Sequence, residues 1–239
     1  MLSYDFNWSV IWTEPYGSWM LQGIWTTISL GFISWCIALT LGIIIGTMRI
    51  TPWKPIRLFA TAYTEFFRDI PLLVQLFFWY FAAPSILPDV IERFLYRELP
   101  NFEFWVVVGL SLYTSSRVAE QIRSGMQSIP TDQYYAALST GFTHLQTYRY
   151  IIIPLAVRIM IPPLTTECLT IFKNTSLAMT VGVLETTFMS QQIEAYTFRG
   201  IEATTVASLV YMAITLMVVL LMGLVEKRLT VPGLITRRR

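Results

Sequence analysis

Charged residues are scarce in this chain of 239 residues. They make up 13% of the sequence, whereas 54% of the residues are hydrophobic. A soluble domain carries about 25% charged residues, so this chain has about half the polar coat that a water-exposed surface needs. The scarcity excludes an ordinary cytosolic globule and indicates an integral membrane protein.

Residue types that build common active sites are also rare. The chain has two cysteines, Cys36 and Cys168, without C-x-x-C spacing, and one histidine, His144. This pattern implies neither a disulfide framework nor a zinc site. The sequence contains no H-E-x-x-H, no G-x-S-x-G and no phosphate-binding G-x-x-x-x-G-K-[ST] motif. We therefore expect no enzymatic activity, no metal and no cofactor in this chain.

The net charge is small, since 17 Lys and Arg against 15 Asp and Glu leave +2. Binding to nucleic acid needs a strong basic field, so no nucleic-acid partner is expected. The first basic residue is Arg49. A cleavable signal peptide begins with a positively charged region, so none is expected here.

Long apolar runs, in contrast, are abundant. A membrane-spanning helix needs about 20 mostly apolar residues. Two such runs, 15–48 and 203–225, are free of charged residues, and three other apolar segments carry a few charges. The sequence predicts an all-α membrane protein with five membrane-spanning helices in one domain, 1–239. The expected helices are about 17–48, 58–83, 104–126, 150–184 (broken) and 203–226, with a cytoplasmic loop at about 127–149.

Basic residues predict the orientation of these helices. If the segment after the first span is placed inside, ten basic residues lie on the inner side and three on the outer side. Cytoplasmic segments are enriched in Lys and Arg, so we expect an outer N-terminus and a cytoplasmic C-terminus. The inner set is Arg49, Lys54, Arg57, Arg123, Arg149, Lys227, Arg228, Arg237, Arg238 and Arg239, and the outer set is Arg93, Arg97 and Arg199. Interfacial anchoring is expected for Trp8, Trp12, Trp19 and Trp25.

Arg117 lies about halfway along the third predicted span. A charge at that depth faces protein or a water-filled cavity. In one interpretation Arg117, Glu120 and Arg123 form an ion ladder, because their i, i+3, i+6 spacing places them on one helix face. In the other, Arg117 offers two N–H donors to a substrate carboxylate, together with the hydroxyls of Tyr113 and Thr114.

The fourth predicted span combines prolines with polar residues. Pro154, Pro162 and Pro163 precede Glu167, and Lys173 begins the polar run 173–176. Broken helices with polar residues at membrane depth line cavities. Lys173 is alternatively a residue that extends its ammonium group to the interface. A ligand that carries charges of both signs needs acidic and basic contacts. The predicted substrate-binding residues are Arg117, Glu167, Tyr113, Thr114, Lys173 and Thr170.

Several motifs resemble those of a known transporter family. The run 133–141 (QYYAALSTG), then nine residues, then 151–154 (IIIP), resembles the signature E-A-A-x-x-x-G-x9-I-x-L-P. That signature marks membrane subunits of bacterial ATP-driven importers. The segments 68–77 (RDIPLLVQLF), 119–125 (AEQIRSG), 162–164 (PPL) and 173–177 (KNTSL) resemble the polar amino acid branch of these permeases. The matches extend from about residue 20 to about residue 230.

This resemblance implies a MetI-like transmembrane fold in the bacterial inner membrane. It implies a dimer of permeases, formed with the same chain or a homologue, a dimer of ATP-binding subunits and an external solute-binding protein. ATP and Mg²⁺ would be bound by the ATPase and not by this chain. In the family the signature loop couples the permease to the ATPase. That role falls here to Tyr135, Ala136, Ala137, Gly141 and Phe142.

Two departures from the family pattern bear on function. The leading glutamate of the signature is Tyr135 here, which suggests that a partner permease supplies the fuller signature. Where many relatives have an aromatic residue in an A-Y-x-A-E pattern, this chain has Arg117. The flanking segments resemble glutamate and aspartate permeases. Our hypothesis is that Arg117 pairs with the side-chain carboxylate of the substrate, with Glu167 near its α-ammonium group.

Other functions remain open at this level. A permease for glutamine, histidine or a basic amino acid would leave Arg117 with a structural role. A secondary transporter or channel that works without ATP is a different class, and no inverted repeat in the sequence supports it. A membrane enzyme would need a catalytic constellation that the sequence lacks.

Overall fold

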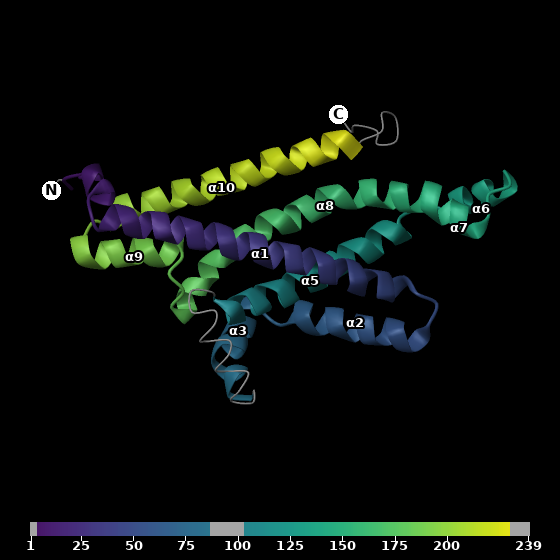
Figure 1. Cartoon of the computed structure of the whole chain (residues 1–239), viewed down its shortest axis with the longest axis horizontal. Coiled ribbons are helices and arrows are strands. Elements are labelled where there is room, and N and C mark those ends of the chain that lie inside the picture. The colour runs from purple at the N-terminus through teal and green to yellow at the C-terminus, as the bar shows by residue number, and fades with distance from the viewer. Residues whose placement is uncertain (1–3, 87–102, 230–239) are drawn as a thin grey trace.

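The computed structural model describes residues 4–86 and 103–229, and every regular element within them is a helix (Figure 1). The α-helices are α1 (Tyr16–Ile50), α2 (Lys54–Asp69), α3 (Leu72–Phe77), α5 (Phe104–Gln127), α6 (Thr131–Ser139), α7 (His144–Thr147), α8 (Ile153–Asn174), α9 (Thr186–Thr197) and α10 (Gly200–Leu229). The 3₁₀ and π turns are η1 (Trp8–Trp12), η2 (Phe78–Ala82), η3 (Pro84–Ile86), η4 (Tyr148–Ile152) and η5 (Thr175–Val181).

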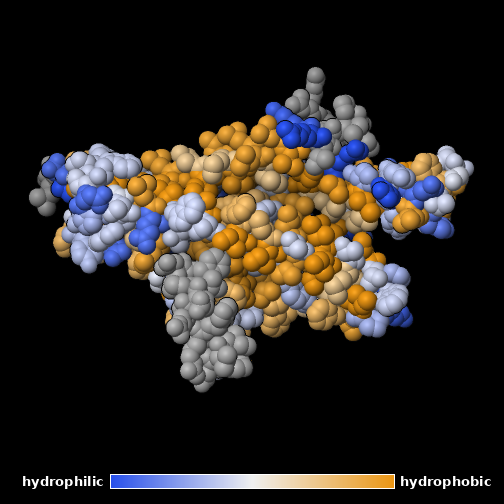
Figure 2. Space-filling model, in the orientation of Figure 1, coloured by the Kyte–Doolittle hydropathy of each residue, from blue (hydrophilic) through white to orange (hydrophobic). Residues whose placement is uncertain are grey.

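The long helices α1, α5, α8 and α10 run along the long axis of the molecule (Figure 1). α9 and the N-terminal residues lie at one end, and α6 and α7 project at the other. Three helical segments are long and apolar enough to cross a membrane: Tyr16–Ile50, His144–Val181 and Gly200–Arg228. Figure 2 shows a hydrophobic surface over the middle of the molecule, with hydrophilic residues gathered toward its ends. The number of spans and the placement of the termini stay predictions.

Two glycines of α1 allow this helix to pack closely against α5. A Cβ at Gly42 would lie 2.4 Å from Cγ1 of Val118, and one at Gly46 would lie 2.6 Å from Cβ of Ile122. Small residues at helix contacts in membranes let the backbones approach each other. This close approach fixes α5, and with it Arg117 and Glu120, against the first long helix.

The segment 58–83, which we expected to be one span, is divided in the structure. α2 ends at Asp69, and α3 begins at Leu72. Pro71 has no N–H and disfavours a helical conformation at Ile70, whose φ and ψ are −85° and 129°. The side-chain amide nitrogen of Gln75 donates to the carbonyls of Phe67 at 2.7 Å and Ile70 at 2.9 Å. Gln75 therefore satisfies carbonyl groups at the end of α2.

The segment 150–184 differs from our expectation in where it departs from an α-helix. α8 continues through Pro162 and Pro163 and ends at Asn174. The irregular turns lie at its two ends, as the π turn η4 before it and the 3₁₀ turn η5 after it. The two prolines thus do not break the helix where the polar residues of α8 lie.

Some predictions fall outside the described residues. Most of the expected outer loop, with Arg93 and Arg97, lies there, and so do Arg237, Arg238 and Arg239. Among the described tryptophans, Trp12 is 69% exposed and Trp25 is 71% exposed. Their exposure leaves both available for the interfacial anchoring that we predict.

Candidate functional site

Arg117 of α5 and Glu167 of α8 form a two-bond ion pair between their helices. Nε of Arg117 donates to Oε2 of Glu167 at 2.7 Å, and Nη2 donates to Oε1 at 3.2 Å. The Glu167 side chain is only 4% exposed, whereas the Arg117 side chain is 36% exposed. Two parallel bonds fix the geometry of such a pair as well as its energy. The pair therefore holds an enclosed carboxylate beside a partly accessible guanidinium.

The ring of Tyr113 completes this group from the same helix. The guanidinium carbon of Arg117 lies 5.9 Å from the centroid of the Tyr113 ring, within reach of a cation–π contact. Thr114, the next residue, is only 2% exposed. The structure thus brings together Arg117, Glu167 and Tyr113 of the predicted substrate-binding set, and it buries Thr114 in the helix packing.

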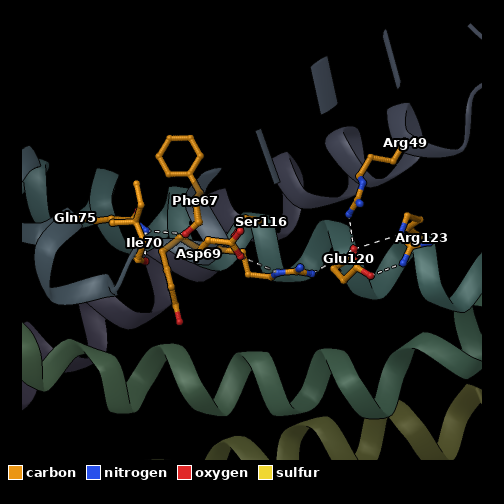
Figure 3. A network of polar contacts seen from close by, with 10 residues as sticks. Arg49, Phe67, Asp69, Ile70, Gln75, Ser116, Glu120 and Arg123 are labelled. Carbon is orange, nitrogen blue, oxygen red and sulfur yellow. Dashed lines mark hydrogen bonds and ion pairs between the residues drawn. The ribbon is translucent and has the colours of Figure 1, made fainter. Parts of the chain in front are cut away.

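The expected ladder from Arg117 to Glu120 is not formed. Glu120 accepts a hydrogen bond from Nη2 of Arg123 at 2.5 Å and pairs with Nη1 of Arg49 (Figure 3). Nη1 of Arg68 lies 3.6 Å from the same carboxylate. We call Arg49, Arg68, Glu120 and Arg123 the Glu120 cluster. It joins the ends of α1 and α2 to α5, and Arg117 pairs with Glu167 instead.

Polar residues of α8 form an accessible stripe. Thr166, Thr170 and Lys173 are spaced i, i+4, i+7, which places them on one face of the helix. Thr166 and Lys173 are exposed, and Thr170 is partly exposed. Lys173 also lines a groove of about 700 Å³ between the end of α8 and α10. The remaining lining residues are Ser176, Thr187, Tyr211, Met212, Thr215, Leu216 and Val219. Thr170 and Lys173 thus lie on an accessible face of α8.

Sequence reasoning missed the buried carboxylate at the start of α9. Glu185 is fully buried and accepts hydrogen bonds from the backbone N–H groups of Thr187 at 2.9 Å and Phe188 at 2.8 Å. The hydroxyl of Tyr211 donates to it at 2.5 Å. Burial raises the pKa of the Glu185 carboxyl, and these hydrogen bonds oppose the rise. Glutamate is not a preferred N-cap residue, so this cap has no signal in the sequence, and its contact with α10 depends on the fold.

The predicted coupling residues lie at the projecting end of the molecule, in α6 and the turn after it. Tyr135 is 63% exposed, Phe142 is 38% exposed and Ala137 is buried. Ala136 is exposed on the same helix. Gly141 has φ of +91°, a conformation that favours glycine, and its N–H donates to the carbonyl of Leu138 at 3.0 Å. The turn at Gly141 thus ends α6 and allows α7 to begin.

In the part of the chain that the structure describes, membrane-length helices, an ion pair with a buried carboxylate between two of them and a projecting α6–α7 hairpin form an architecture suited to a membrane transport subunit. The family model described as binding-protein-dependent transport system inner membrane component matches residues 38–231, and the chain belongs to this family. The resemblance drawn from the sequence motifs is therefore confirmed.

Known relatives place the chain among amino acid permeases. It is 35% identical to the glutamate/aspartate import permease protein GltJ of Escherichia coli strain K12, over 97% of this chain and 98% of the relative. It is 34% identical to the probable glutamine ABC transporter permease protein GlnM of Bacillus subtilis strain 168, over 87% of this chain and 92% of the relative. The crystal structure of an amino acid ABC transporter with histidines matches with a TM-score of 0.77 and 30% identity, over 95% of this chain and all of that chain. The protein is a permease subunit of an amino acid ABC importer of the inner membrane.

Proposed function

We propose that this chain forms part of the pathway for glutamate and aspartate, which an external binding protein delivers. The observation that supports this proposal is the Arg117–Glu167 pair, with its partly exposed guanidinium and enclosed carboxylate. An amino acid carries both charges of such a pair. It can therefore enter between the two side chains, its side-chain carboxylate on Arg117 and its ammonium group near Glu167, and replace one ion pair by two.

The summed charge of the predicted substrate-binding residues, which extend along α8 from the pair to Lys173, favours an acidic substrate. Arg117 and Lys173 supply two positive charges, and Glu167 supplies one negative charge, which leaves a net charge of +1. Glutamate and aspartate carry one net negative charge at neutral pH. A neutral amino acid would leave one cation uncompensated at membrane depth, which is unfavourable. Tyr113 and Thr170 line the same route as uncharged donors.

The energy for transport comes, in this proposal, from a separate ATPase that binds ATP and Mg²⁺. Tyr135, Ala136, Ala137, Gly141 and Phe142, at the α6 end, transmit its movements to the helices. The pathway then opens alternately to each side of the membrane as the two states exchange. The proposal takes from the sequence the prediction of five spans, an outer N-terminus and a cytoplasmic C-terminus, and it assigns this end to the ATPase side. Because Tyr135 stands in place of the signature glutamate, we expect a homologous second permease and not a second copy.

A second candidate is a permease for glutamine or another polar amino acid. The similarity to a probable glutamine permease supports it. In that case the two hydrogen bonds between Arg117 and Glu167 stay intact throughout transport, and the pair only joins α5 to α8.

Transport by the reconstituted complex distinguishes these functions. The chain is combined in liposomes with its companion permease, ATPase and binding protein, and uptake of labelled glutamate, aspartate, glutamine and arginine is measured with and without ATP. We expect ATP-dependent uptake that prefers the two acids. A preference for glutamine or arginine would support the second candidate, and uptake without ATP would overturn both.

Variants then test Arg117 itself. Removing one charge leaves the other unpaired, so the informative variant is the double substitution Arg117→Gln with Glu167→Gln. We expect it to lose the preference for acidic substrates, whereas Arg158→Gln, which removes a different guanidinium from α8, keeps it. An Arg117→Gln, Glu167→Gln complex that still prefers glutamate and aspartate would refute the assigned role.

A further inference from the structure

A second cavity lies at the α6 end of the molecule, away from the Arg117–Glu167 pair. It has a volume of about 390 Å³ and lies between α6 and the ends of α1, α2 and α5. We call it the tyrosine pocket. Its lining residues are Arg49, Ile50, Arg57, Met126, Gln127, Ile129, Pro130, Thr131, Tyr134, Tyr135, Tyr148 and Ile152.

The charge of this lining is entirely positive. Arg49 and Arg57 are its charged residues, and no carboxylate is among them. The Arg49 side chain is 9% exposed and uses Nη1 for Glu120, while its buried Nε has no hydrogen-bond partner among the described residues. Arg57 is exposed, and its guanidinium forms no ion pair with the part of the chain that the structure describes. Arg57 therefore brings an exposed guanidinium with unused donors to this pocket, beside Arg49, whose Nη1 is paired with Glu120 and whose Nε is buried.

Uncharged donors surround these arginines. Tyr134, Tyr135 and Tyr148 bring three phenol groups, and the hydroxyl of Tyr134 is paired with Nδ1 of His144 at 2.7 Å. Tyr135 occupies the position at which the family signature has a glutamate. A glutamate there would add a carboxylate to the lining and reduce its positive potential. With Tyr135 in place of the glutamate, the pocket lining has no negative charge and can bind an anion.

Apolar side chains beside Arg57 indicate where this anion comes from. On the first two turns of α2 and just before them, Trp53 is 69% exposed, Leu58 is 71% exposed and Phe59 is 61% exposed. Exposed tryptophan and aliphatic groups next to Lys54 and Arg57 are typical of a surface in contact with lipid headgroups. A free anion would make no contact with this apolar surface, whereas the acyl chains of a lipid would cover it.

We propose that the tyrosine pocket binds the phosphodiester headgroup of an anionic phospholipid, with Arg49 and Arg57 as its charged contacts. The lipid chains lie along Leu58 and Phe59. Because Tyr134 and Tyr135 belong to α6, the headgroup connects that helix to α1 and α2. The proposal concerns binding to this chain and holds for any transported substrate.

Binding of a soluble lipid to the purified complex tests this site without the charge of a whole membrane. The complex in neutral detergent is titrated with dihexanoylphosphatidylglycerol, and binding is followed by calorimetry. Arg57→Gln is compared with Lys54→Gln, which removes a basic residue from the same turn of α2 but not from the pocket lining. We expect saturable binding that weakens about fivefold in Arg57→Gln, the effect of one basic residue on an anionic lipid, and less than twofold in Lys54→Gln.

A second pair of variants tests the pocket through α6. Tyr135→Glu introduces the signature residue, and Tyr135→Gln is its uncharged control. We expect Tyr135→Glu to weaken lipid binding more than Tyr135→Gln. Equal losses in Arg57→Gln and Lys54→Gln, or no saturable binding, would overturn the proposal. The proposal would also be overturned if inorganic phosphate or glutamate displaced the lipid with an affinity equal to that of the lipid, because the site would then bind a free anion.

Discussion

At the scale of single residues, Glu167 depends on its partner. Its carboxylate is almost fully enclosed, and the structure gives it two hydrogen bonds from Arg117. A buried charge that loses its partner costs more than the pair contributes to stability, whereas removal of both charges is often tolerated. The Arg117–Glu167 pair should therefore respond very differently to single and double substitutions.

We expect Arg117→Met to destabilise the complex by about 2 kcal/mol, less than for a fully buried pair because Arg117 is partly exposed. The double variant Arg117→Met, Glu167→Met should recover most of that loss. Thermal unfolding of the wild type, both single variants and the double variant gives the coupling energy. Additive effects of the two substitutions would show that the pair contributes nothing to stability.

Gln75 is another residue whose side chain is important for stability. Its amide nitrogen donates to two carbonyls near Pro71, which has no backbone N–H. We expect Gln75→Leu to destabilise the protein by about 1–3 kcal/mol, because the carbonyls of Phe67 and Ile70 lose their donor. Gln191→Leu, on the exposed face of α9, serves as the control. Equal melting temperatures for the two variants would contradict this role of Gln75.

At the scale of the helices, the sequence predicted long apolar segments better than the points at which helices end or divide. The uncharged runs at 15–48 and 203–225 lie in α1 and α10, because length and apolar composition are local properties. The division between α2 and α3 also has a local signal, Pro71, which the apolar composition of 58–83 concealed. Pro162 and Pro163 gave the opposite error, since α8 continues through them.

The same division between local and distant signals applies to the site. Arg117 and Glu167 were identifiable because charges are rare in apolar segments. Their mutual bond was not, because they are 50 residues apart and lie on different helices. Tyr211 was missed for the same reason. Its bond to Glu185 depends on how α10 packs against α9.

The contact between α1 and α5 is sensitive to side-chain volume because glycines of α1 lie directly against side chains of α5. Gly42→Ala would place a methyl group against Val118, and we expect a loss of about 1–3 kcal/mol from overpacking. Gly223→Ala on α10 is the matched control, because nothing lies within 4 Å of its added Cβ. The comparison of the two melting temperatures removes the gain in helix propensity that both share. Recovery of stability by Val118→Ala in the Gly42→Ala background would confirm the contact.

At the scale of the whole molecule, the predicted orientation assigns its two ends to opposite sides of the membrane. In a variant without Cys36 and Cys168, we expect Ser9→Cys to react with an impermeant maleimide added outside intact cells. Ser139→Cys in α6 should react only after the membrane is opened, because the α6 end is cytoplasmic in this prediction. Labelling of both positions from the outside would contradict the five-span topology.

The N-terminal residues are fastened to the beginning of the last helix. The hydroxyl of Tyr4 donates to Glu202 at 2.5 Å, and the backbone N–H of Asn7 donates to the same carboxylate at 2.8 Å. Glu202 is fully buried by this contact. Because synthesis proceeds from the N-terminus, Tyr4 and Asn7 can bind Glu202 only after most of the polypeptide has left the ribosome. Attachment of Tyr4 and Asn7 is therefore a late event in biogenesis, and a chain truncated before α10 would keep the packing of Ile11 on Met20 but lack the carboxylate that holds these two residues.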